Sequence, residues 1–205
     1  MNWFIDTLGQ VELVKTLVST ANWLVNNLGQ VGGYFLIHAL LSLGAVVAAA
    51  VLSVPLARLA VATRRFGGLL LGAFSLLYAV PSLPMLVVIP VILGVPVRSP
   101  LNMVIVLTLY GISVLVTQVA EAFRSLPEDV VEAANALGVD PWRRFWQVEM
   151  PLAVPVLIAG LRVVAASTVS LVTVGALVGV QSLGTLFTDD YRGAGRDGDR
   201  DWAPD

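Results

Sequence analysis

Four long stretches without an acidic or basic residue constrain this chain most. Each can cross about 30 Å of hydrocarbon as a helix that rises about 1.5 Å per residue. A structure that spans a bilayer must satisfy its backbone polar groups internally, and a helix does so within one segment. The sequence therefore predicts an all-α, polytopic membrane helix bundle of about four spans. The stretches are Tyr34–Ala57, Gly67–Val97, Ser99–Ala120 and Val163–Thr188, the last preceded by a less hydrophobic lead-in, Leu152–Leu161.

Composition agrees with a membrane protein. Hydrophobic residues make up 57% of the chain and charged residues 13%, against about 25% charged residues in soluble domains. The net charge of −2 gives no reason to expect a nucleic-acid partner. With no cysteine and a single histidine, His38, the chain lacks ligands for a thiolate or histidine metal site, and no cofactor is expected. Serines occur in the stretches without a base to activate them, which disfavours a membrane-embedded enzyme.

The second stretch is too long for one straight helix, at roughly 46 Å if it is helical throughout. Four prolines interrupt it: Pro81, Pro84, Pro90 and Pro96. Each removes a backbone donor and crowds the preceding turn. We expect a span that is kinked at Pro81–Pro84 and ends near Pro90, where protein or a cavity shields the freed carbonyls. A kink that serves packing alone is the alternative.

Arginines gather in two of the segments that separate the stretches. The positive-inside rule places both segments in the cytoplasm of a multi-pass plasma (inner) membrane protein, so the N-terminus is expected outside. Arg162 is expected at the inner surface, because an arginine at the bilayer centre costs about 2.5–3.5 kcal/mol. No Asp, Glu or Lys lies within a stretch, which disfavours ion-coupled transport. The arginines after the first stretch are Arg58, Arg64 and Arg65, and those between the third and fourth are Arg124, Arg143, Arg144 and Arg162.

The stretches divide the chain into three parts. Residues 1–33 lack the basic start and apolar core of a signal peptide. We expect them to be extracytoplasmic and interfacial, with Trp3 and Trp23 near the headgroups, or to form a partly disordered tail. Residues 34–188 are expected to form the transmembrane domain, with a cytoplasmic loop at 121–162. Residues 189–205 are a polar tail that is either genuine or the product of a truncation or frameshift near Asp190.

The loop begins with the signals of a short helix. Ser125 and Glu128 have the spacing of a capping box, in which each side chain bonds the other residue's amide. The helix is expected over Glu128–Leu137 and should stop at Gly138, a residue that adopts a left-handed conformation readily.

A second helix start follows at once. Asp140 is expected as the N-cap and Pro141 as the first helical residue. This helix, Trp142–Met150, should end before Pro151. The loop is thus predicted to be a helix–glycine turn–helix element.

Apolar side chains recur at helical spacing in both halves of the loop. Two interpretations remain open: an element that docks into a groove of a partner protein, or an amphipathic hairpin that rests on its own bundle and on lipid. The first stripe consists of Val130, Val131, Ala134 and Leu137, and the second of Trp142, Phe145 and Trp146.

The segment Glu132–Pro151 resembles the cytoplasmic pattern E-A-A-x3-G-x9-I-x-L-P of ABC importer permeases. It keeps the spacing throughout, with Val148 and Met150 in place of Ile and Leu. In that family the segment is the coupling helix, which docks into a groove on the cytoplasmic ATPase. The resemblance implies a bundle of the ABC importer permease type that has no catalytic centre of its own. The residues expected to couple it to the ATPase are Glu132, Ala133, Ala134, Leu137, Gly138 and Pro151.

Three further segments resemble the glycine betaine/carnitine/choline (osmoprotectant) permeases: Val80–Leu83, Leu152–Arg162 and Ala176–Gly184. This resemblance implies import of such quaternary amines, with another small solute, such as the amino acid methionine, as the alternative. Pro81 and Ser82 are candidates for the translocation path.

The resemblance also implies partners. These are a dimer of cytoplasmic ABC ATPases, an extracytoplasmic substrate-binding protein, a second permease subunit that is the same or a related chain, and membrane lipid. Permeases of this kind continue with one more apolar span, where this sequence turns polar. A truncated, non-functional permease fragment is therefore a further alternative.

Overall fold

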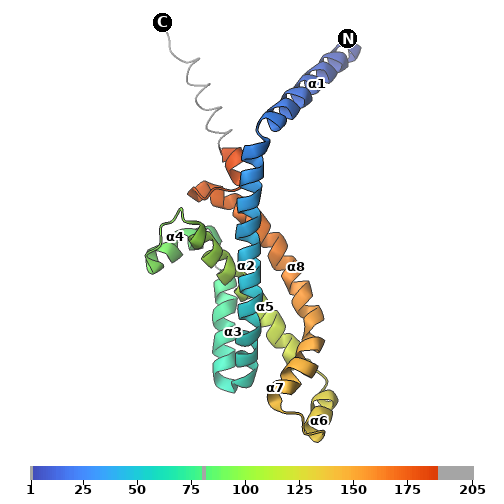
Figure 1. Ribbon diagram of the computed structural model, residues 1–205, viewed down its shortest axis with the longest axis vertical. Coiled ribbons are helices and arrows are strands. Elements are labelled where there is room, and N and C mark those ends of the chain that lie inside the picture. The colour runs from blue at the N-terminus through green and yellow to red at the C-terminus, as the bar shows by residue number, and fades with distance from the viewer. Residues whose placement is uncertain (1, 80–81, 189–205) are drawn as a thin grey trace.

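A computed structural model describes residues 2–79 and 82–188, with the side chains of residues 14–63, 66–78 and 84–188. All regular structure in these ranges is helical (Figure 1). The elements are α1 (Asn2–Asn26), α2 (Leu28–Ala62), α3 (Arg64–Ala79), α4 (Ser82–Leu93), α5 (Pro100–Arg124), α6 (Glu128–Ala136), α7 (Pro141–Arg144), the π-turn η1 (Phe145–Glu149), α8 (Met150–Val174) and the 3-10 turn η2 (Gly175–Val178).

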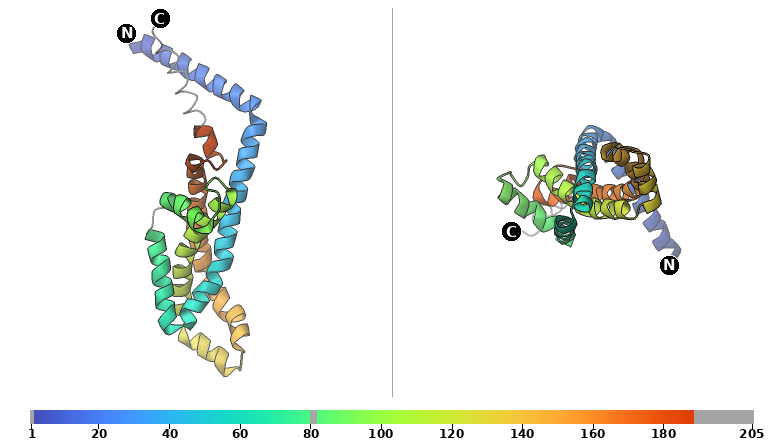
Figure 2. Two further views of the ribbon diagram at one scale, coloured as in Figure 1. Left: turned by 90° about the vertical axis from the view of Figure 1, so that its left-hand side faces the viewer. Right: turned by 90° about the horizontal axis from the view of Figure 1, so that it is seen from below.

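Helix α1 stands apart from the other helices. Figures 1 and 2 show it projecting from the top of α2, close to the end of the described chain. Its side chains from Val14 to Asn26 are exposed, including Trp23 at 49%. Residues 2–26 therefore form a helix that extends away from the bundle of α2, α5 and α8, and its position at a membrane surface stays a prediction.

Helices α2, α5 and α8 form the core of the bundle. Small residues occur at three- and four-residue spacing on the buried face of α2, among them Ala45, Ala49 and Ala57. Such residues let helix backbones approach closely in lipid. Gly111 of α5 lies at the tightest point, since a Cβ there would be 2.6 Å from Cβ of Ala49 and 3.1 Å from Cγ1 of Val164. The three helices therefore meet at mid-length.

Among residues 2–79 and 82–188, three helical segments are long and apolar enough to cross a membrane: Leu28–Ala62, Pro100–Arg124 and Pro141–Val178. The second predicted stretch instead forms two shorter helices, α3 and α4. Helix α4 lies to one side of the core (Figure 2). Asn102 fixes this position, because its Nδ2 donates to the carbonyls of Leu86 at 3.1 Å and Val97 at 3.0 Å. The predicted kink at Pro81–Pro84 is not tested, because Pro81 lies outside the described residues, which end at Ala79 and resume at Ser82.

The expected end of that stretch near Pro90 is wrong. Helix α4 contains Pro90 and runs to Leu93. Gly94 then takes a φ of 67°, and the Val95 amide donates to the Pro90 carbonyl at 3.0 Å. This is the bonding of a Schellman motif, so the glycine rather than the proline terminates the helix.

The predicted boundary of the fourth span is also wrong. Helix α8 starts at Met150 and includes the whole lead-in Leu152–Leu161. Pro151 does not end the preceding helix but lies in the first turn of α8, where a missing amide costs little. As a consequence Arg162 lies halfway along a helix that can span a membrane, and not at its inner end.

Candidate functional site: the α6–η1 element

Helix α6 starts at Glu128 as expected, but the capping of its first turn differs. The residue before it is Pro127, and no side chain caps its first turn. Ser125 instead ends α5, and its hydroxyl donates to the Ala122 carbonyl at 3.1 Å. The predicted capping box with Glu128 is therefore wrong, because the serine side chain is used by the preceding helix.

The turn after α6 is confirmed. Gly138 has a φ of 72°, and the Val139 amide donates to the Ala134 carbonyl at 3.1 Å. No other atom lies within 4 Å of a Cβ built on Gly138. The requirement for glycine here is therefore conformational, since an L-residue pays a backbone penalty in this region.

The next start is confirmed as well. The Asp140 carboxylate accepts from the Trp142 amide at 3.1 Å, and Pro141 opens the helix. Helix α7 then widens into the π-turn η1, which passes directly into α8. Inserted turns of this kind occur often at functional sites. They shift the side chains that follow relative to a regular helix.

Phe145 fastens η1 to the bundle. It is 6% exposed, and its ring lies 5.6 Å from that of Phe123 at the end of α5. The guanidinium of Arg58 lies 5.3 Å from the centre of the same ring, a distance at which a cation is attracted to the ring face. The second predicted stripe thus divides, because Phe145 turns inward while Trp142 and Trp146 stay 69% and 49% exposed.

Glu149 is the buried charge of the element, at 4% exposure. Its Oε2 lies 2.7 Å from a terminal nitrogen of Arg58 on α2. Its Oε1 accepts from Nε of Arg144 at 2.9 Å, and Arg144 also donates to Oδ1 of Asn135 on α6. One carboxylate therefore connects α6, α7 and α2. A buried carboxylate with two arginine partners is satisfied, whereas loss of one partner leaves a costly buried charge.

Sequence reasoning missed this network. Glu149 occupies an unspecified position of the E-A-A pattern. The signal available was an acid near two arginines, Arg143 and Arg144, in an otherwise apolar segment. The partner on α2 could not be found this way, because Arg58 lies far away along the chain.

An open apolar groove of about 1060 Å³ lies between α2 and the α7–η1 segment. Its α2 wall includes Val51, Val54 and Leu59, and its other wall includes Trp142 and Trp146. The groove explains why these tryptophans remain exposed.

The predicted coupling residues divide into two groups. Glu132, Ala133 and Leu137 are exposed, with Leu137 at 82%, whereas Ala134 is buried at 6%. Figure 1 shows α6 at the far lower end of the molecule, beyond α3 and α5. Gly138 sits in the turn beside this surface. Pro151 lies separately, exposed in the first turn of α8.

The candidate translocation residues are placed only in part. Pro81 lies outside the described residues. Ser82 begins α4, and its side chain is not described. A role for either residue stays a prediction.

Comparison with known proteins gives one family. Residues 49–195 match the family model described as binding-protein-dependent transport system inner membrane component.

Individual relatives are transport permeases. The chain is 35% identical over 115 residues to the ergothioneine transport permease/ergothioneine binding protein EgtU of Helicobacter pylori (strain G27), which covers 56% of this chain and 20% of that protein. It is 28% identical over 162 residues to the glycine betaine/carnitine/choline transport system permease protein OpuCD of Bacillus subtilis (strain 168), covering 77% of this chain and 69% of that protein. It is 28% identical over 180 residues to the osmoprotectant import permease protein OsmW of Salmonella typhimurium, covering 86% and 83%. The matched region therefore spans only a fifth of the first relative but most of the other two.

Solved structures share the fold. A chain of the inward-facing MetNI methionine ABC transporter in its native crystal form matches with a TM-score of 0.69 at 19% identity, over 76% of this chain and 77% of that chain. A second crystal form matches with a TM-score of 0.64 at 20% identity, over 73% and 74%. This likeness confirms the predicted all-α membrane bundle.

Proposed function

Because this chain belongs to the family of binding-protein-dependent transport system inner membrane components, we propose that it is the permease subunit of an ATP-driven importer whose α6–η1 element receives the motion of a partner ATPase. A permease component is not itself catalytic, so ATP is hydrolysed by the partner. The partners proposed are a cytoplasmic ATPase dimer, an extracytoplasmic binding protein and a second permease subunit.

The observation that carries this proposal is the division of the element into an exposed half and an anchored half. Helix α6 presents Leu137 at 82% exposure at the end of the molecule. Within twelve residues the chain is held on the bundle by Phe145, against Phe123, and by Glu149, against Arg58 on α2. A push on α6 would therefore reach the spanning helices through rigid, buried contacts rather than through a loose loop.

The alternative is an amphipathic hairpin that rests on its own bundle. This alternative agrees with the burial of Phe145 in η1, but it does not explain the exposed apolar side chains of α6. A helix that rested on the bundle would bury its apolar stripe, whereas Val130 and Leu137 are 39% and 82% exposed. The exposed apolar and small residues favour a partner groove.

We propose quaternary-amine osmoprotectants as the solutes. Relatives named for glycine betaine, carnitine and choline transport and for osmoprotectant import support this choice. The relative named for ergothioneine is compatible with it, since ergothioneine also carries a quaternary ammonium group. Another small solute, such as methionine, is the second candidate, favoured only by the fold it shares with the MetNI structure.

The test is a site-directed crosslink in a chain that contains no cysteine. The Leu137→Cys permease would be co-expressed with its partner ATPase, whose docking groove carries one introduced cysteine. A disulfide-bonded product that forms with Leu137→Cys is expected. Leu101→Cys, 58% exposed at the opposite end of α5, is the matched control and should give none. Equal yields of the disulfide-bonded product from Leu137→Cys and Leu101→Cys would contradict docking of α6 on the ATPase.

A further inference from the structure

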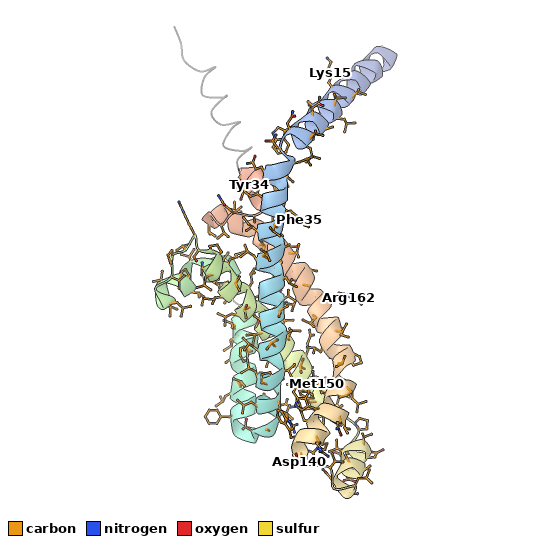
Figure 3. All side chains as sticks on the ribbon, in the orientation of Figure 1. Lys15, Tyr34, Phe35, Asp140, Met150 and Arg162 are labelled. Atoms are coloured by element: carbon orange, nitrogen blue, oxygen red, sulfur yellow. The ribbon has the colours of Figure 1, made fainter. Side chains whose placement is uncertain are left out.

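Arg162 is a charged residue in the middle of α8, which belongs to one of the described segments long and apolar enough to span a membrane. It is the middle residue of the 25 residues of α8, about 18 Å along the helix from Met150 at a rise of about 1.5 Å per residue. Figure 3 shows it between the levels of Met150 and Tyr34. Val164, two residues further, meets Gly111 and, through it, Ala49 at mid-length of α5 and α2. Arg162 therefore lies near the middle of the bundle's height.

Within the described part of the chain, Arg162 has no ion-pair or hydrogen-bond partner and is exposed. Figure 3 shows it on the side of α8 that faces away from α2. A charged side chain inside a membrane normally faces a bundle interior or a water-filled cavity, and marks a substrate or ion pathway. An exposed face of α8 that carries such a residue is therefore not expected to face lipid.

The rest of that face has a mixed composition. The buried side of α8 includes Ala153, Gly160, Val164, Thr168 and Val172. The opposite side, at helical spacing around Arg162, is exposed and combines small or polar residues with two bulky residues, Ile158 at 53% and Val169 at 48% exposure. These small or polar residues are Pro155, Ala159, Ala166 and Ser170.

A path for solute does not run through the centre of a single chain. Met103, Leu107, Leu115, Val116 and Val172 are among the fully buried residues that fill the space between α2, α5 and α8. A solute that crosses the membrane must then pass along an outer face of the bundle, enclosed by another subunit.

We propose that the Pro155–Ser170 face of α8 lines the solute path opposite a second permease subunit, and that Arg162 binds the carboxylate of a zwitterionic quaternary-ammonium solute there. This rests on the proposed function. An arginine pairs with a carboxylate by two parallel hydrogen bonds, which glycine betaine and carnitine can accept and choline cannot. A fixed positive charge at mid-depth also opposes the entry of a solute that is only a cation.

Thiol accessibility tests the location. Ala159→Cys and Ala166→Cys, each close to one helical turn from the native Arg162, would be introduced singly into the full permease–ATPase complex in lipid nanodiscs. The probe is the anionic, water-soluble methanethiosulfonate ethylsulfonate, read by mass on the permease chain. Both cysteines are expected to react. Leu69→Cys, 72% exposed on the apolar outer surface of α3, should not. Reactivity of both α8 cysteines as low as that of Leu69→Cys would place the face in lipid and overturn the proposal.

Protection tests the ligand class without a binding protein. Excess glycine betaine is expected to slow labelling of Ala166→Cys severalfold, and the same concentration of choline is expected to leave it unchanged. Equal protection by the two solutes, or none by either, would overturn carboxylate binding at Arg162.

Transport by variants in the complete reconstituted system gives an independent readout. Arg162→Gln should lower ATP-dependent glycine betaine uptake by about tenfold or more, as expected for loss of a hydrogen bond between charged groups, while ATP hydrolysis is retained. Arg162→Lys should lose less, and Arg124→Gln, an exposed arginine at the end of α5, should match the native protein.

Uptake by Arg162→Gln equal to native would overturn the inference but leave the proposed function intact. A native complex that takes up no solute with ATP would instead contradict the proposed function. If the Arg162→Gln complex fails to assemble, labelling and protection of the Ala159→Cys and Ala166→Cys variants, which keep Arg162, test the inference instead.

Discussion

At the scale of single residues, Glu149 has the most specific surroundings in the candidate site. It is almost completely buried, and its two oxygens face Arg58 and Arg144. Both arginines keep some contact with water, at 33% and 19% side-chain exposure. The charge of the Glu149 carboxylate is therefore stabilised mainly by these two arginines, whereas water also solvates each arginine.

Replacement of Glu149 with Gln should therefore loosen η1 from α2. The amide keeps the shape but loses both charge-assisted interactions, so we expect a loss of about 1–3 kcal/mol in stability. We also expect ATP hydrolysis that no longer responds to solute. Thermal unfolding in detergent and solute-stimulated ATPase activity measure the two effects. Glu121→Gln, an exposed carboxylate on α5, is the control and should change neither. A Glu149→Gln protein with native stability and coupling would show that the network is not needed.

Gly138 makes a second prediction at this scale. Its φ of 72° costs an L-residue about 1–2 kcal/mol, and a β-branched side chain is tolerated least. Gly138→Val should reduce solute-stimulated ATPase activity while the complex still assembles. Gly138→Asn is the matched control, because Asn enters the left-handed region more readily, and it should retain most of the activity. If Val and Asn behave alike in an assembled complex, the backbone conformation of this turn is not what matters.

At the scale of elements, the contact between α2, α5 and α8 depends on the absence of a side chain at one position. Gly111 faces Ala49 and Val164 so closely that a Cβ would be 2.6 Å from the Ala49 Cβ. Gly44 on α2 also lies in a helix interior, but no atom lies within 4 Å of a Cβ built there. The two glycines therefore have the same local setting and opposite tertiary settings.

Substitution by alanine should separate these two settings. Gly44→Ala should be neutral or stabilise by up to about 1 kcal/mol, because alanine favours a helix. Gly111→Ala should destabilise by about 1–3 kcal/mol, since the added methyl overpacks the contact. Unfolding of both proteins in the same detergent or lipid measures the difference. Equal stability of the two variants would mean that the three helices can move apart without cost.

At the scale of the whole molecule, a group of arginines lies at the end that carries α6. Arg58 and Arg144 meet at Glu149 there, and Arg124 ends α5 beside it. The positive-inside rule then predicts that α6 lies in the cytoplasm and α1 outside. This orientation is also the one in which a cytoplasmic ATPase could reach α6.

Labelling from one side of the membrane tests the orientation. Val25→Cys on α1, 66% exposed, should react with a membrane-impermeant maleimide in intact cells whose outer barrier has been removed. Leu137→Cys should react only in inside-out vesicles. The reverse pattern would contradict both the orientation and the proposed docking of an ATPase.

Much of the element structure could be predicted from the sequence alone. The uncharged stretches gave the spanning helices, because burial in lipid leaves the backbone few alternatives to a helix. The turn at Gly138 and the start at Asp140 were also predicted correctly, since caps and left-handed glycines act within a few residues. The capping box at Ser125 failed because two adjacent helices competed for one hydroxyl, and the preceding helix obtained it.

What the sequence determined by itself is therefore local: an all-helical membrane chain, interrupted by one short polar element with defined ends. The tertiary structure alone decided that η1 continues into α8, because Phe145 is held against Phe123 from another helix. It also decided that Glu149 pairs with Arg58, and that Arg162 lies halfway along α8 rather than before its start. Each of these depends on contacts between residues far apart in the chain, and hydrophobic periodicity carries no information about which distant side chains meet.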